Sequence, residues 1–263
     1  MPMLGLGTWQ NSDHDQCAES VRTALETGYR HVDTAQAYRN EAAVGEGIAA
    51  ASVDRDDVFL ATKVWISNLS YDDVHRSFEA SLDRLGTGYV DLLYVHWPAR
   101  TYDPEATMRA LGDLHDDGLI RHVGVSNFTP DHVEEAREHL SAPVFANQVE
   151  MHPFLPQEHL RAFAAETDLE LVAYSPLARG ELLDEPTVSD IASDHGASPA
   201  QVGLAWLREA GVTAIPKATS PAHIRDNWAS LELELSDAEL DRIDRIGRRE
   251  RLLDPDFGPD AWH

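Results

Sequence analysis

Residues 58–96 read VFLATKVWISNLSYDDVHRSFEASLDRLGTGYVDLLYVH and contain one complete unit of the predicted fold. The apolar run from Val58 to Lys63 predicts a strand, and the run from Val90 to His96 predicts a second one. Between them, Ser70 begins a segment of helical period that Gly86 ends, because serine favours helix starts and glycine favours helix stops. The order strand, helix, strand predicts two parallel strands joined by a crossover helix.

The same alternation continues through the chain. Eight strands are predicted: Leu4 to Gly7, His31 to Asp33, Val58 to Lys63, Val90 to His96, Ile120 to Ser126, Val144 to Gln148, Glu170 to Ser175 and Val212 to Pro216. Eight such units in 263 residues predict an α/β protein with a closed (β/α)8 or TIM barrel, whose active site lies at the C-terminal ends of the strands. An open doubly wound sheet is the alternative.

Helix signals lie between the strands. Helices are predicted from Asp13 to Gly28, from Ser70 to Gly86 and from Asp103-Pro104 to Gly118, and after Thr129-Pro130, Pro156, Ser198-Pro199 and Ser220-Pro221. Two extra helices, Thr187 to His195 and Ser236 to Ile246, fall outside the eight units. Residues 1–263 are therefore expected to form one barrel domain, with residues 248–263 as a short C-terminal tail near the active-site mouth.

Acidic residues greatly outnumber basic ones, with 46 Asp and Glu against 21 Lys and Arg and a formal net charge of -25. So negative a surface repels polyanions, which argues against nucleic acid and anionic membranes as partners. An acidic surface poor in lysine is also one response to concentrated salt, where charge repulsion is screened. The composition therefore predicts a halophilic protein, with an ordinary acidic mesophilic protein as the alternative.

Three absences indicate the compartment. No apolar run approaches the ~18 residues of a membrane span, and the N-terminal MPMLGLGTWQ lacks the basic and apolar regions of a signal peptide. Cys17 is the only cysteine, so no internal disulfide can form, which favours a reducing compartment. We expect a soluble, cytoplasmic monomer without a membrane partner.

Only two lysines occur in the chain, Lys63 and Lys217, and each stands where an apolar run ends. Other polar or aromatic side chains also end or follow the predicted strands: Trp9, Asp33, His96, Ser126, Asn127, Gln148, Tyr174 and Ser175. Any one of them alone is weak evidence, since a strand-end Asp is usually a helix cap and a strand-end Lys is usually solvated. In a closed barrel, however, these positions form one ring around one mouth.

Four residues of this region suit proton transfer to a carbonyl. Tyr38 follows the second strand, and its phenol, with a usual pKa near ~10, needs a neighbouring positive charge to favour the phenolate. Lys63 supplies that charge, Asp33 holds Lys63 protonated and oriented, and His96 can hydrogen-bond a substrate carbonyl. The site has no nucleophile and no metal ligands, so the reducing equivalent must come from a cofactor.

Several motifs, in order along nearly the whole chain, resemble the aldo-keto reductase superfamily. They are GYRHVDTAQAYRNEAAVG (28–45), TKVW (62–65), HWP (96–98), GVSNF (124–128) and IPK (215–217). The resemblance implies an NADPH-dependent oxidoreductase that reduces aldehydes and ketones, with Tyr38 as general acid and Asp33, Lys63 and His96 as its partners.

The resemblance also implies a set of cofactor contacts. The nicotinamide is expected to stack on Tyr174, with its carboxamide bound by Ser126, Asn127 and Gln148. The remaining cofactor-binding candidates are Thr8, Trp9, Asp33, Ser175, Pro176, Leu177, Ile215, Lys217, Ala218, Thr219, His223, Asp226 and Asn227.

The segment KATSPAHIRDN (217–227) departs from the family pattern at two positions. Ala218 replaces the usual hydroxyl residue, and His223 replaces the usual arginine, so two contacts to the 2′-phosphate of NADP(H) are altered. Lys217 remains as a point charge suited to that phosphate. We expect NADP(H), with NAD(H) or dual use as the alternative.

Aromatic residues adjoin the predicted ring and suggest an apolar pocket for a small carbonyl substrate. Trp9, Trp65, Trp97 and His96 are pocket candidates, with Phe128 and Trp262 as weaker ones; for Trp97, packing in the barrel core is an equal alternative. Only Ala99 to Asp103 separate the fourth strand from the next helix, which is shorter than is usual in the family and predicts an open, permissive pocket.

Other functions stay open from the sequence. Alcohol oxidation would be the same reaction in reverse. Lys63 could form a Schiff base as in an aldolase, although an adjacent carboxylate that keeps the lysine charged argues against it. A nicotinamide-binding sensor or accessory subunit with little turnover is the third possibility, because the same superfamily includes such proteins.

Overall fold

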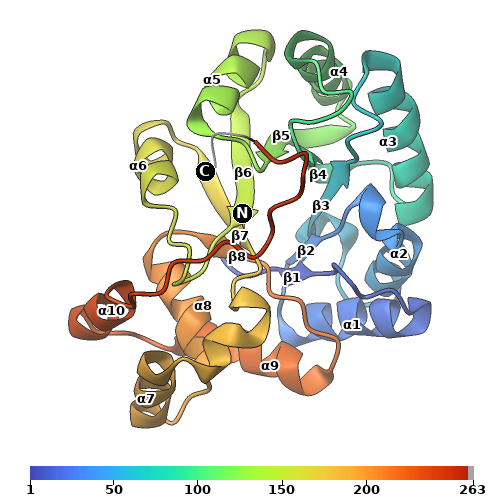
Figure 1. The fold of residues 1–263 in the computed structure, drawn as a ribbon. Helices are drawn as coiled ribbons and strands as arrows, with labels where there is room; N and C mark the ends of the chain where they lie inside the picture. Colours follow the sequence, from blue (N-terminus) through green and yellow to red (C-terminus); the bar gives the residue numbers. More distant parts are fainter. Residues whose placement is uncertain (260–263) are drawn as a thin grey trace.

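Eight parallel strands form a barrel in the computed structural model, which describes residues 1–259 (Figure 1). The strands are β1 (Leu6–Gly7), β2 (His31–Asp33), β3 (Phe59–Val64), β4 (Val90–Val95), β5 (Ile120–Ser126), β6 (Val144–Glu150), β7 (Glu170–Tyr174) and β8 (Thr213–Ala214). Consecutive strands are neighbours from β1 to β8. β1 and the residue before it also pair with the last strand region, where the Gly5 amide donates to the Ala214 carbonyl at 2.8 Å and the Gly7 amide to the Pro216 carbonyl at 3.1 Å. These contacts close the barrel and exclude the open sheet.

All eight predicted strands are present, and their ends differ from the prediction by a few residues. The largest extension is in β6, which continues two residues past Gln148 because Glu150 still pairs with Tyr174 of β7. The largest reduction is in β8, where regular pairing covers only Thr213 and Ala214. The two additional residues of β6 carry the strand to Glu150, toward the active-site mouth.

Ten α-helices surround the barrel within the described residues (Figure 1). They are α1 (His14–Thr27), α2 (Glu41–Ala50), α3 (Tyr71–Leu85), α4 (Pro104–Asp116), α5 (Pro130–His139), α6 (Glu158–Glu166), α7 (Pro186–His195), α8 (Pro199–Glu209), α9 (Pro221–Ala229) and α10 (Asp237–Asp244). The predicted starts agree with the caps: the Asp13 side chain accepts a hydrogen bond from the Gln16 amide at 2.9 Å, and Gly28 ends α1 at φ 131°, which only glycine adopts easily. The two extra helices are α7 and α10, and α10 ends at Asp244, two residues before the predicted end.

Apolar side chains fill both the space between strands and helices and the inside of the barrel. The inner layer contains Ala61, Leu92, Tyr94, Ala146, Val172 and Ile215. At the N-terminal end of the strands, the rings of Phe59, His122 and Phe145 stack on one another, with centroids 4.1 Å apart for the last two. These rings fill this end, and the large cavity lies at the C-terminal ends of the strands.

After α10 the chain has no regular secondary structure through residue 259 and crosses the front of the barrel in Figure 1. No helix within residues 1–259 is long and apolar enough to cross a membrane. Cys17 is buried in α1.

Candidate active site

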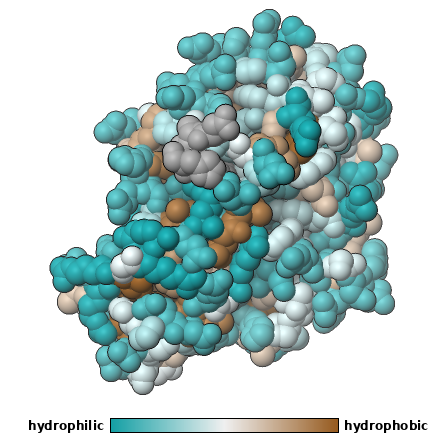
Figure 2. All heavy atoms as spheres, viewed as in Figure 1, coloured by the Kyte–Doolittle hydropathy of each residue, from teal (hydrophilic) through white to brown (hydrophobic). Residues whose placement is uncertain are grey.

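A cavity of about 1010 Å³ lies at the C-terminal ends of the strands. Figure 2 shows apolar surface in the middle of this face, bordered by hydrophilic side chains. Residues from the ends of nearly all strands line it, together with residues of the C-terminal tail. The predicted ring of strand-end residues is therefore brought together in one place.

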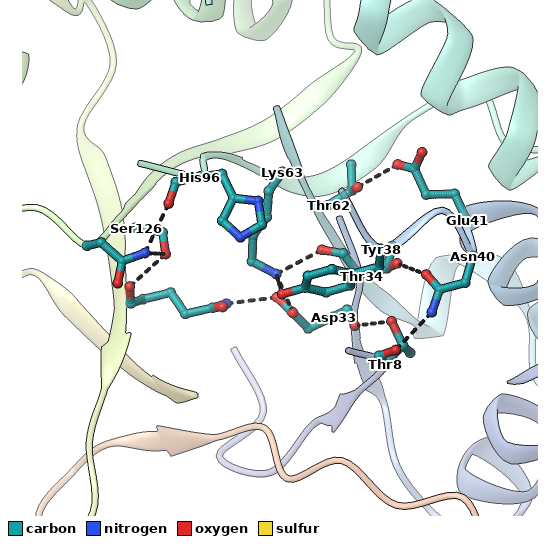
Figure 3. A network of polar contacts seen from close by, with 12 residues as sticks. Thr8, Asp33, Thr34, Tyr38, Asn40, Glu41, Thr62, Lys63, His96 and Ser126 are labelled. Carbon is teal, nitrogen blue, oxygen red and sulfur yellow. Dashed lines mark hydrogen bonds and ion pairs between the residues drawn. The ribbon is translucent and has the colours of Figure 1, made fainter. Parts of the chain in front are cut away.

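Asp33, Lys63 and Tyr38 form a connected polar group at one end of this cavity (Figure 3). Lys63 Nζ lies 2.5 Å from Asp33 Oδ1, 2.8 Å from the Thr34 carbonyl oxygen and 3.3 Å from Tyr38 Oη. The Lys63 side chain is fully buried, and Asp33 is 1% exposed. Gln148 Nε2 donates to the second oxygen of Asp33 at 2.8 Å. The ammonium and the carboxylate thus each have a fixed set of partners.

The electrostatics of Asp33 and Lys63 are dominated by burial. Burial raises the pKa of Asp33 and lowers the pKa of Lys63, in each case toward the neutral form. The attraction between the two groups and their hydrogen bond oppose these shifts, and Gln148 adds to this effect on Asp33. Each charge therefore depends on the other for its stability in the barrel.

The pKa of Tyr38 differs from the expectation drawn from the sequence. The sequence predicts that Lys63 lowers the phenol pKa, but in the free protein burial raises the pKa of Tyr38 well above its usual range, and the charge of Asp33 raises it further. The phenol is consequently protonated throughout the physiological pH range. An ammonium 3.3 Å from Oη favours the phenolate only relative to the same buried site without Lys63.

His96 lies beside Tyr38, with ring centroids 5.8 Å apart in an edge-on arrangement, and contacts Trp65 in the same way at 5.0 Å. Burial and the charge of Lys63 lower the pKa of His96 well below its usual value, so the ring is neutral. It lines the cavity, and its Nδ1 has no hydrogen-bond partner among residues 1–259. A neutral imidazole in this place can donate one hydrogen bond to a bound carbonyl.

Two residues that the sequence interpretation missed hold the loop of Tyr38 in place. The side chain of Asn40 accepts from Thr34 Oγ1 at 2.8 Å and donates to the carbonyl of Thr8 at 2.8 Å, which ties this loop to the end of β1. Gln36 accepts from the Trp65 amide at 3.0 Å, which ties it to the end of β3. Neither residue stands at a strand end, so the strand-end criterion could not find them.

The predicted carboxamide site forms a continuous hydrogen-bonded chain. Ser126 Oγ donates to the Gln148 carbonyl at 2.8 Å, and Asn127 Nδ2 donates to Ser126 Oγ at 3.0 Å and to the His96 carbonyl at 3.0 Å. Tyr174 Oη donates to Asn127 Oδ1 at 2.9 Å. This chain fixes the Tyr174 ring where it lines the cavity.

The same cavity contains most of the other predicted cofactor residues. Thr8, Trp9, Ser175, Pro176, Leu177, Ile215, Lys217, His223, Asp226 and Asn227 line it, and Lys217 and His223 are exposed. Two residues predicted to contact the cofactor, Ala218 and Thr219, do not line the cavity. Ala218 is buried, and the Thr219 carbonyl accepts a hydrogen bond from Ser20 Oγ at 3.4 Å. Ser198, which the sequence interpretation missed, lines the cavity and donates to Asp226 Oδ2 at 2.7 Å.

The pocket beside Tyr38 has aromatic walls. Trp9 is 36% exposed, with the Arg179 guanidinium 5.0 Å from its ring, and Trp65 lines the cavity from the end of β3. Trp97 serves both roles considered for it, because it is 3% exposed and still lines the cavity. Phe257 of the tail contacts Trp97 with a centroid distance of 5.5 Å.

The prediction for Phe128 needs correction. Phe128 is 1% exposed and does not line the cavity, since its ring packs between Tyr102 and His132 behind β5. The positive φ of 64° at Asn127 accompanies the change of direction that places Asn127 in the cavity and Phe128 in the core. Trp262 lies outside the described residues. Within residues 1–259 no group of three or more His, Cys, Asp or Glu side chains could hold a metal ion.

Comparisons with known proteins show what the whole chain is similar to. The model of the Aldo/keto reductase family matches residues 3–248. A glyoxal reductase of Bacillus subtilis is 40% identical over 252 residues, covering 96% of this chain and 91% of its own, and a methylglyoxal reductase of Yersinia pestis is 38% identical over 265 residues, covering 100% and 99%. The solved aldose reductase of Schistosoma japonicum superposes with a TM-score of 0.92 at 32% identity, covering 96% of this chain and 91% of that one.

Proposed function

Because the chain belongs to the aldo/keto reductase family, we propose that it reduces small aldehydes and ketones to alcohols at the cavity described above, with NADPH as the hydride donor. Family membership and the glyoxal and methylglyoxal reductases among the relatives support carbonyl reduction. The observation that carries it is Tyr38, which lines the cavity and whose hydroxyl oxygen lies 3.3 Å from Lys63 Nζ.

The cavity fits a dinucleotide together with a small substrate. Its volume of about 1010 Å³ is at the upper end of the ~300–1,000 Å³ typical of ligand pockets, more than a small carbonyl compound needs. Tyr174 provides a flat ring whose hydroxyl bonds to the Asn127 side-chain amide, and Gln148 and Lys217 line the same cavity. When bound, a reduced nicotinamide would supply the hydride for the carbonyl carbon.

Tyr38 is proposed to donate its proton to the carbonyl oxygen as negative charge develops there. Its high pKa keeps the proton available, and the positive charge of Lys63 stabilises the phenolate that remains after transfer. Asp33 retains the ammonium form of Lys63 by the 2.5 Å ion pair. His96, being neutral, hydrogen-bonds the carbonyl oxygen and positions it without competing for the proton.

Aldolase chemistry on Lys63 fits this geometry less well. An imine requires that Nζ reach the substrate carbonyl, but Lys63 is fully buried and is not among the residues that line the cavity. A sensor subunit with little turnover is separated from the reductase by single-turnover hydride transfer from bound NADPH. If the protein is a reductase, the bound cofactor is oxidised when an aldehyde is added. If it is a sensor, no oxidation is expected.

The setting of the protein is also part of the proposal. We propose a cytoplasmic monomer adapted to concentrated salt, on the basis of the net charge of -25 and the scarcity of lysine. NADPH is favoured over NADH because Lys217 lines the cavity and is exposed, whereas Ala218 and His223 provide weaker support for a 2′-phosphate.

The direct test is Tyr38→Phe. This variant keeps the ring and loses the proton, so we expect NADPH binding within about twofold of wild type and a fall in kcat of about 10² to 10⁴, the usual size of a general-acid contribution. Cofactor fluorescence titration and reduction of glyoxal, methylglyoxal and larger aldehydes provide the readouts. Turnover near wild type would show that another group is the acid.

A further inference from the structure

Glu150 is a buried carboxylate that the proposed reaction does not use. It is the last residue of β6 and is fully buried. Gln148, which donates to Asp33, precedes it by two residues, and residues two apart in a strand lie on the same face. Glu150 therefore points to the same side of β6 as the polar group around Tyr38, but nearer the mouth.

Both oxygens of Glu150 are used to hold the C-terminal tail. Oε1 accepts from the Leu252 amide at 2.7 Å, and Oε2 accepts from the Leu253 amide at 2.8 Å. His152 Nε2 lies 2.9 Å from Oε1 and is itself fully buried. Burial would raise the pKa of Glu150, but the hydrogen bonds from His152 and from the two amides outweigh it and leave the pKa below its usual value. The carboxylate is thus ionised and makes charge-assisted bonds, the stronger kind.

Leu253, which Glu150 holds, and the tail residues that follow it form the outer wall of the pocket. Leu253, Pro255 and Phe257 line the cavity. The Phe257 ring meets Trp65 at a centroid distance of 6.2 Å and Trp97 at 5.5 Å, both edge-on. Leu253, whose amide binds Glu150 directly, is itself one of these wall residues. The position of the wall is therefore coupled to the Glu150 carboxylate.

We propose that Glu150 is a positioning residue that sets substrate specificity. By clamping residues 252–253, it keeps the outer wall closed over carbonyl compounds with an aromatic or bulky apolar substituent. This inference rests on the proposed reductase function. A small dicarbonyl such as methylglyoxal reaches only the region around Tyr38 and His96 and does not need the wall. An aromatic aldehyde gains affinity from Phe257, Trp65 and Trp97, and this gain scales with the fraction of protein in which the wall is closed.

Glu150→Gln tests the clamp. Glutamine has the same shape but only one acceptor oxygen, and its amide group would face a backbone N–H donor. We expect KM for 4-nitrobenzaldehyde to rise about tenfold or more while KM for methylglyoxal and both kcat values stay within about twofold. Glu158→Gln, the same change at an exposed glutamate on α6, is the matched control and should leave every value unchanged.

A second readout does not depend on activity. Hydrogen exchange of the Leu252 and Leu253 amides, followed by mass spectrometry, should be faster in Glu150→Gln by about tenfold or more and unchanged in Glu158→Gln. Unchanged exchange in a folded Glu150→Gln protein overturns the clamp. If neither aldehyde is reduced by any form of the protein, the proposed function fails, and the exchange experiment still decides on the clamp.

Phe257→Ala removes the aromatic ring of the outer wall and leaves Glu150 unchanged. We expect it to raise KM for 4-nitrobenzaldehyde to a similar extent, and the double variant Glu150→Gln/Phe257→Ala to add little, because both changes act on one wall. If Phe257→Ala leaves the aromatic aldehyde unaffected, or if the two effects are fully additive, the specificity role of the clamp is overturned. This variant also keeps the specificity role testable if Glu150→Gln does not fold.

Discussion

Replacing Lys63 by methionine should destabilise the protein far more than an ordinary lysine substitution. Methionine keeps most of the apolar length of lysine but leaves Asp33, 1% exposed, without its 2.5 Å partner; the Gln148 amide at 2.8 Å is its remaining side-chain donor. Breaking a buried ion pair from one side costs about 3–5 kcal/mol. At a urea dependence of about 3 kcal/mol/M, the midpoint of unfolding should fall by about 1–2 M.

The size of this loss should depend on pH in a defined direction. Burial raises the pKa of Asp33, and the loss of Lys63 removes the attraction that opposes this rise. A carboxyl with a higher pKa in the folded than in the unfolded state binds more protons when folded, so stability falls as pH rises above the unfolded value of about 3.9. The destabilisation of Lys63→Met should thus be clearly larger at pH 8 than at pH 5.

Urea unfolding at both pH values provides the measurement, and the chain offers a matched control. Lys217, the only other lysine, is exposed, so Lys217→Met should change the unfolding free energy by no more than about 0.5 kcal/mol. The double variant Asp33→Asn/Lys63→Met removes both charges and should recover much of the stability without recovering reduction. The reasoning is refuted if Lys63→Met unfolds at the wild-type urea concentration at pH 8, or if the double variant is no more stable than the single one.

Three further predictions concern cofactor, pH and salt. Lys217→Ala should weaken NADPH binding by about 10- to 100-fold in a fluorescence titration and leave NADH binding nearly unchanged. His223→Arg should strengthen NADPH binding. Equal losses of affinity for both cofactors in Lys217→Ala would contradict a phosphate contact. For reduction, kcat/KM should be level from about pH 6 to 9, because burial raises the pKa of Tyr38 well above its usual value and lowers that of His96 well below its usual value; a break near pH 6.5 would mean that His96 titrates. Molar KCl should raise the melting temperature, since it screens the repulsion that accompanies a net charge of -25, and an unchanged value would argue against adaptation to salt.

Much of the site could be predicted because a closed parallel barrel places all strand ends at one rim. Asp33, Lys63 and Gln148 were found by that rule, although Gln148 and Asp33 lie 115 residues apart in the chain. The rule failed for side chains that reach the rim from elsewhere. Asn40 lies in a loop and Phe257 in the tail, and no local pattern distinguishes them from other loop residues.

The sequence by itself determined the order of strands and helices, since hydrophobic period, caps and glycine stops act within about ten residues. It also determined which polar residues could meet. Only the tertiary structure decided that Phe128 faces the core, that burial raises the pKa of Tyr38 despite Lys63, and that Glu150 holds the Leu252 amide 102 residues away. Burial and long-range hydrogen bonds are properties of the packed chain, because they depend on which groups exclude water from one another.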